Sequence, residues 1–100
     1  MTLAEFKASL SSATPPAGLS PALVALWHDG QGDWNTAHSV AQDIDGKVGA
    51  WVHAYLHRKE GDLSNASYWY RMAGKVDGKG PELDEWATIA EELLESLPGA

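Results

Sequence analysis

The segment from Ala50 to Gly74 reads AWVHAYLHRKEGDLSNASYWYRMAG and predicts two antiparallel helices joined by a tight turn. The turn is Gly61-Asp62, because glycine adopts left-handed backbone angles and aspartate caps the start of the next helix. Before this turn, apolar residues cover more than one side of the helix, which is typical of a helix packed on two sides. We therefore expect the helix from about Lys47 to Glu60 to be the central one.

An earlier segment repeats this arrangement at a shift of 29 residues, from Gly32-Asp33 to Gly61-Asp62. The inner stripes of the two second helices also coincide: Trp34, Ala37, Ala41 and Ile44 match Leu63, Ala66, Tyr70 and Ala73. The same shift places Ala25 on Ala54 and His28 on His57. Small residues lie where two helix axes approach most closely, so the shared positions predict a helical hairpin that occurs twice.

The second hairpin resembles the tetratricopeptide pattern, and GDLSNASYWYRMAG resembles its Sel1-like variant, in which a Gly-Asp turn leads to Ala, then Trp-Tyr, then Ala. The resemblance covers roughly residues 20–74. The sequence departs from the pattern at Ala50, where a large residue usually opens the unit, at His57, where Tyr or Leu is common, and at Ala41, where an aromatic is usual. The repeat is also shorter than the customary one. The resemblance implies a scaffold that binds proteins or peptides on a concave face, with no reaction and no cofactor.

Further helices are expected at both ends of the chain. Thr2 and Glu5 form a capping box for a short first helix, and a loop rich in Pro and Gly follows it. Pro81 opens a last helix, whose inner stripe is Leu83, Trp86, Ala90, Leu93 and Leu97. The sequence thus predicts an all-α fold of about six helices in one domain, residues 1–100. Its parts are an N-terminal helix and loop (1–18), two hairpins (20–74) and a C-terminal capping helix (81–97).

Composition disfavours several classes of partner. The 100 residues carry 14 acidic and 7 basic side chains, a net charge of −7, which disfavours nucleic-acid backbones and anionic membranes. No apolar run approaches the roughly 18 residues that a membrane span needs. The N-terminal segment lacks a basic leader before an apolar core, and the chain has no cysteine. We expect a cytoplasmic protein.

The resemblance also implies a binding surface, because the first helix of each tetratricopeptide unit lines the concave face. The residues that would point there are Leu26, Asp29, Trp51, Tyr55 and Arg58. Trp, Tyr and Arg often anchor protein interfaces. Three alternatives remain open: a protein or peptide binds this groove, a terminal helix covers it and buries Trp51 and Tyr55, or a second copy covers it in a homodimer. The acidic residues Glu91, Glu92 and Glu95 form either a solvated face or a patch for a basic partner.

The four histidines, at positions 28, 38, 53 and 57, provide the alternative function. His53 and His57 are four residues apart on one predicted helix, a spacing that can hold one metal ion. His28 occupies the position equivalent to His57, with Asp29 beside it, so a metal-dependent hydrolase would use His28, His53 and His57. The repeat offers a structural explanation, since His28 and His57 stand where an aromatic normally packs. The sequence therefore predicts a small protein- or peptide-binding module rather than an enzyme, and assigns no catalytic residue, metal ligand or cofactor.

Overall fold

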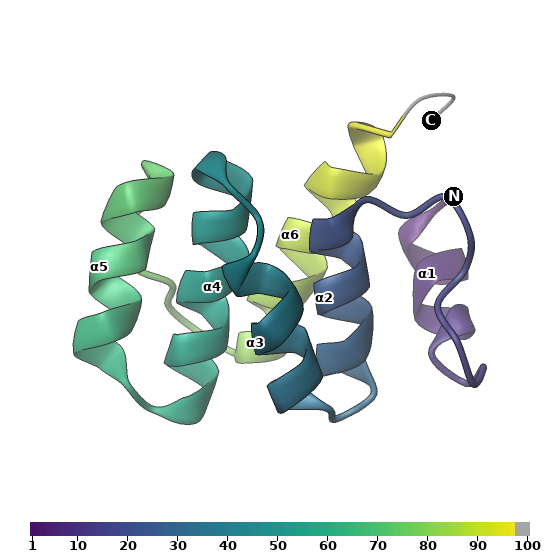
Figure 1. The fold of residues 1–100 in the computed structure, drawn as a ribbon, viewed down its shortest axis with the longest axis horizontal. Helices are drawn as coiled ribbons and strands as arrows, with labels where there is room; N and C mark the ends of the chain where they lie inside the picture. Colours follow the sequence, from purple (N-terminus) through teal and green to yellow (C-terminus); the bar gives the residue numbers. More distant parts are fainter. Residues whose placement is uncertain (98–100) are drawn as a thin grey trace.

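The computed structural model describes residues 1–97, which form six helices and no strand (Figure 1). The helices are α1 (Leu3–Ser9), α2 (Pro21–Gly30), α3 (Trp34–Gln42), α4 (Gly46–Glu60), α5 (Leu63–Ala73) and α6 (Glu82–Glu95). The predicted all-α fold class is confirmed. None of the helices in this range combines the length and the apolarity needed to cross a bilayer.

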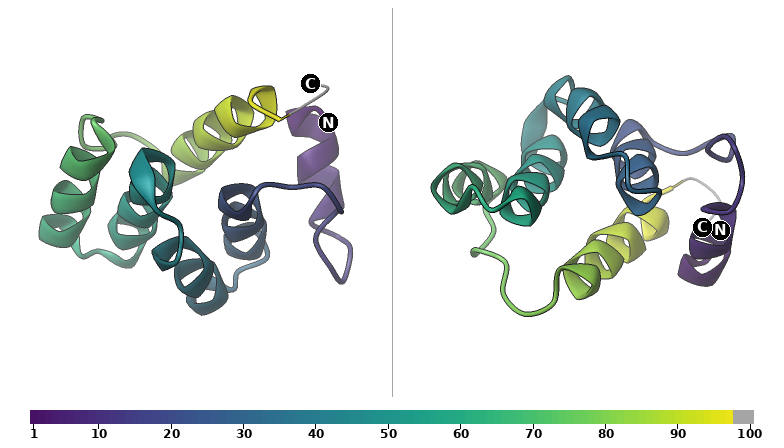
Figure 2. Two further views of the ribbon diagram at one scale, coloured as in Figure 1. Left: turned by 45° about the horizontal axis from the view of Figure 1, so that its top comes forward. Right: turned by 90° about the horizontal axis from the view of Figure 1, so that it is seen from below.

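Helices α2 to α5 follow one another along an arc, and α6 crosses the inner side of that arc (Figure 2). Contacts join α2 to α3, α3 to α4, and α4 to α5, so each helix packs against its neighbour in the chain. Helix α6 contacts both α2 and α4, and α1 lies against α6 at the α2 end of the arc. The first and last helices therefore meet although almost the whole chain separates them.

The turns that join α2 to α3 and α4 to α5 have the same local geometry. Gly32 and Gly61 have φ angles of 85° and 92°, a conformation that is strained for residues with a side chain. The next residue, Asp33 or Asp62, accepts a hydrogen bond from the backbone N–H three positions later, over 3.2 Å and 3.3 Å. Each aspartate thereby caps the helix that follows it. This equivalence holds at the shift of 29 residues seen in the sequence.

Helix α4 is the central helix, as its apolar pattern predicts. Every residue from Gly49 to His57 is buried. Ala25 of α2 and Ala54 of α4, which are 29 residues apart, are both fully buried. Burial of α4 on all sides follows from its four neighbours, because α2, α3, α5 and α6 each contact it.

Two of the predicted inner stripes begin with an exposed residue. Leu63 and Leu83 are 65% and 77% exposed, so their assignment to the core is wrong. Each lies in the first turn of its helix, and burial starts at the next residue of the stripe, Ala66 or Trp86. Periodicity identifies the inward face of a helix but does not show how far its end projects beyond its neighbours.

Helix α6 is attached to the inner side of the arc by polar contacts as well as by its apolar stripe. The Trp86 indole N–H donates to the Leu26 carbonyl over 2.9 Å. The Arg58 guanidinium pairs with Glu85 over 2.8 Å, and both side chains are 11% exposed. The Tyr70 hydroxyl donates to the second oxygen of Glu85 over 2.5 Å. The contacts of Glu85 therefore hold the start of α6 against α4 and α5.

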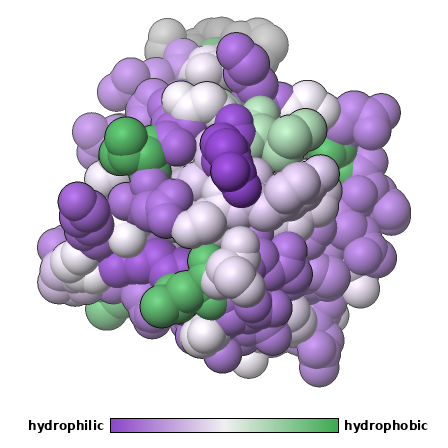
Figure 3. Space-filling view, turned by 90° about the vertical axis from the view of Figure 1, so that its left-hand side faces the viewer, coloured by the Kyte–Doolittle hydropathy of each residue, from purple (hydrophilic) through white to green (hydrophobic). Residues whose placement is uncertain are grey.

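The outer face of α5 exposes several apolar side chains, among them Tyr68 and Met72. Seen from that side of the molecule, the hydrophobic surface is divided into separate spots among hydrophilic atoms (Figure 3). Isolated exposed apolar residues are common on protein surfaces. This face therefore does not present a continuous apolar surface to a partner.

Candidate metal centre

Three histidines from two helices converge at the contact between α3 and α4. His38 belongs to α3, and His53 and His57 lie one turn apart on α4. One candidate ligand atom from each lies within 4.8 Å of the other two. The Nε2 atoms of His38 and His53 are 3.0 Å apart. His53 and His57 are buried, and His38 is half-buried, so the cluster lies just beneath the surface.

The cluster differs from the set that the repeat suggested, because His38 takes the place of His28. The His28 ring packs edge-on against Trp27, outside the cluster. Asp29 also lies elsewhere and accepts hydrogen bonds from Tyr55 and Lys59, each over 2.9 Å. Equivalent positions in two hairpins need not meet. Here α3 lies against the side of α4 that carries the histidines.

Two tryptophans stack on the histidines of the cluster. Trp34 stacks on His38 with ring centroids 4.8 Å apart and an angle of 11° between the planes. Trp69 of α5 stacks on His53 at 4.2 Å and 21°. The Trp34 indole N–H donates to the Leu56 carbonyl of α4 over 2.8 Å, which holds that ring in place. The two imidazole planes are therefore set by packing before any ligand binds.

Polar neighbours select one tautomer of His57. Its Nδ1 lies 2.6 Å from a Glu60 carboxylate oxygen, and because a carboxylate only accepts, Nδ1 carries the proton. The Asn65 amide nitrogen lies 3.4 Å from Nε2 and donates to it. The proton on Nδ1 places the lone pair of His57 on Nε2, where a metal ion would replace the Asn65 donor. A carboxylate on the far nitrogen is the usual outer partner of a metal-binding histidine.

Burial favours the neutral form of the cluster. Removal from water lowers the pKa of His53 to about 4, and the neighbouring His57 and His38 add to this effect. Burial also lowers the pKa of His38, with His57 as the second cause. Neutral imidazole is the form that binds a metal ion, since a protonated ring has no free lone pair. At neutral pH, His38 and His53 are thus in the binding form.

The spacing of the nitrogens suits a tetrahedral ion. Zinc bound to imidazole at about 2.0–2.1 Å places its ligand nitrogens about 3.3 Å apart. The separation between His38 and His53 is close to this value. A cavity of about 290 Å³ is lined by His53 and Trp69 and so touches one side of the cluster. The three imidazoles therefore have the ligand type and the spacing that a metal ion requires, and the cavity reaches them at His53.

The residues predicted to form a concave binding surface are largely covered. Leu26, Tyr55 and Asp29 are 0%, 1% and 2% exposed, Trp51 is 9% exposed, and Arg58 is engaged with Glu85. This arrangement corresponds to the alternative in which a terminal helix covers the groove, and α6 is that helix. Of the five residues, Trp51 lines a groove between α4 and α6, and Asp29 and Tyr55 line a separate cavity beside Trp86.

Sequence reasoning missed His38 and the residues around the cluster. One signal was present: three successive helices each carry a pair four residues apart, and the pairs are Trp34/His38, His53/His57 and Asn65/Trp69. Such pairs share one face of a helix, so three of them predict a cluster if the three faces meet. The sequence does not show whether they meet.

Comparison of the chain with protein-family models, with curated proteins and with solved structures gives no match. The resemblance to the tetratricopeptide pattern therefore stays a prediction.

Proposed function

We propose that the protein binds one divalent transition-metal ion through His38, His53 and His57, with Zn²⁺ as the first candidate. The observation that carries the proposal is the convergence of three imidazole donors within 4.8 Å. Imidazole ligands favour zinc, copper and nickel over magnesium and calcium, which prefer oxygen. Glu60 supports the assignment, because it holds His57 in the tautomer that presents Nε2.

A purely structural role for the cluster explains less of its geometry. Apolar side chains would fill the same space without the desolvation that three polar rings require. The only hydrogen bond recorded among the three described rings joins His38 to His53. A metal ion would use one lone pair from each ring at once. The polar character of the cluster is therefore better accounted for by a ligand than by packing.

The site would connect the two predicted hairpins. His38 comes from the second helix of the first hairpin, and His53 and His57 come from the first helix of the second. Three protein ligands leave the fourth position of a tetrahedral ion for water or another small ligand, as in catalytic zinc sites. The hydrolase alternative requires such an open position, now with His38 in the place of His28.

The proposal is tested by titrating Zn²⁺ into tag-free protein, first treated with EDTA and then dialysed, in competition with a chromophoric chelator. We expect one equivalent to bind. We expect His38→Gln, His53→Gln and His57→Gln each to weaken binding by at least about tenfold, because each removes a ligand. His28→Gln is the matched control, since it removes a histidine outside the cluster.

Two results would overturn the assignment. The first is wild-type protein that takes up no stoichiometric Zn²⁺, Ni²⁺ or Cu²⁺. The second is equal loss of binding in His28→Gln and His38→Gln, which would indicate general surface binding by histidines. Far-ultraviolet circular dichroism of each variant checks that the helices persist.

A further inference from the structure

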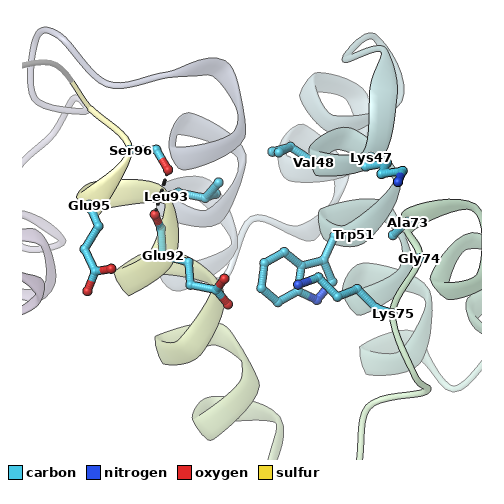
Figure 4. A pocket seen from close by; sticks show the side chains of 10 residues that line it. All are labelled: Lys47, Val48, Trp51, Ala73, Gly74, Lys75, Glu92, Leu93, Glu95 and Ser96. Carbon is cyan, nitrogen blue, oxygen red and sulfur yellow. Dashed lines mark hydrogen bonds between the residues drawn. The ribbon is translucent and has the colours of Figure 1, made fainter.

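A second site lies away from the histidines, in a groove of about 620 Å³ between the start of α4 and the end of α6. Glu92 and Leu93 of α6 point across it toward Trp51 and Val48 of α4 (Figure 4). No residue of the histidine cluster lines this groove. It is an open part of the inner face that α6 otherwise covers, and it contains the predicted anchor Trp51.

The groove already holds a cation. The Lys75 ammonium lies 4.1 Å from the centre of the Trp51 ring, in a cation–π contact. Lys75 belongs to the segment between α5 and α6 and is itself exposed. Within residues 1–97 it takes part in no ion pair. The contact shows that this face of Trp51 accommodates a positive charge carried by a flexible side chain.

We propose that this groove binds a Lys or Arg side chain from a basic peptide segment of a partner protein, and that Lys75 occupies the same place when the partner is absent. With Lys75 displaced, Glu92 and Glu95 remain in the groove against Lys47. Glu91 adds to the acidic end of α6, and the chain as a whole carries a net charge of −7. Both the local and the overall charge therefore attract a basic segment.

The same features argue against other occupants. An acidic segment would meet Glu92, Glu95 and the excess negative charge of the chain. A purely apolar segment would leave the groove carboxylates without a partner. An arginine suits the site best, because its planar guanidinium stacks on an indole while it donates hydrogen bonds to a carboxylate.

A direct test uses the peptide acetyl-Gly-Leu-Arg-Leu-Gly-amide at low ionic strength. The control peptide carries citrulline in place of arginine, which keeps the shape and removes the charge. Binding is followed by nuclear magnetic resonance through the indole N–H signal of Trp51, assigned with Trp51→Phe. We expect the arginine peptide to shift this signal and the citrulline peptide to leave it in place.

Variants of the protein distinguish binding in this groove from general electrostatic attraction. Lys75→Gln removes the internal competitor and should tighten binding about two- to fivefold, the size of an exposed cation–π contact. Lys79→Gln makes the same charge change in the same segment but outside the groove, and should have a smaller effect. Glu92→Gln should weaken binding by a similar factor. Equal effects of Lys75→Gln and Lys79→Gln, an unshifted Trp51 signal, or equal binding of both peptides would overturn the proposal.

Discussion

The Nε2 atoms of His38 and His53 lie 3.0 Å apart, although the two residues belong to different helices and are 15 positions apart in the chain. In the absence of a metal ion, one neutral ring donates to the other across this distance. To bind an ion through both Nε2 atoms, the donating ring would move its proton to Nδ1, and two coordinate bonds would replace the hydrogen bond.

Glu60→Gln should weaken the binding of Zn²⁺ by about tenfold, within the range found for outer partners of metal ligands. The amide keeps the shape of the carboxylate. Because its NH₂ group can also donate, it no longer requires the proton of His57 to stay on Nδ1. Competition with a chromophoric chelator measures the change. Glu91→Gln is the control, because Glu91 is exposed on α6. Equal affinities of the two variants would show that Glu60 does not orient His57.

Acid should destabilise the metal-free protein through His53. In the folded state the pKa of His53 is about 4, against an ordinary value of 6.5, so between these values the unfolded chain binds the proton and the folded chain does not. Stability is therefore fully present above pH 6.5 and falls as the pH drops to 4, by at most about 3 kcal/mol from this group. Urea unfolding at several pH values, with EDTA present, measures the slope. His53→Gln should flatten the curve, and an unchanged slope in that variant would contradict the prediction.

Glu85→Ala should reduce the free energy of unfolding by about 3 kcal/mol, because it leaves Arg58 and Tyr70 without their partner at a largely buried position. Glu91→Ala, on an exposed face of the same helix, should change it by less than about 0.5 kcal/mol. Urea denaturation compares the two. A small effect of Glu85→Ala would mean that the contacts of Glu85 add little to the docking of α6.

Gly49→Ala should destabilise the protein, although alanine favours a helix by about 1 kcal/mol over glycine. A Cβ atom at position 49 would lie 2.2 Å from the backbone carbonyl oxygen of Ile44, so the backbone would have to shift. The expected net loss is at least about 1 kcal/mol, measured by thermal and urea unfolding. Thr88→Ala, at an exposed position of α6, isolates the propensity effect and should raise stability by a few tenths of a kcal/mol. If Gly49→Ala is as stable as the wild type, the backbone of the turn before α4 can shift at little cost in free energy.

Local signals in the sequence were sufficient to place the helices. Thr2 and Glu5 form the predicted capping box, Ser20 caps α2, and Gly61 ends α4 in a left-handed conformation. Each of these features depends on residues within about four positions of one another. The same range covers His53 and His57, so their spacing alone indicates a candidate metal-binding pair.

Local patterns of a few residues do not predict contacts between segments that are far apart in the chain. The sequence alone left open whether a partner, a terminal helix or a second copy covers Tyr55, and α6 does so through Trp86 and Glu85. It paired His28 with His57 because their positions match, whereas the structure brings His38 to that site. The start and end of a helix are set by a few neighbouring hydrogen bonds. Which faces of two helices meet depends on the fit of many side chains at once, and only the tertiary structure decided that.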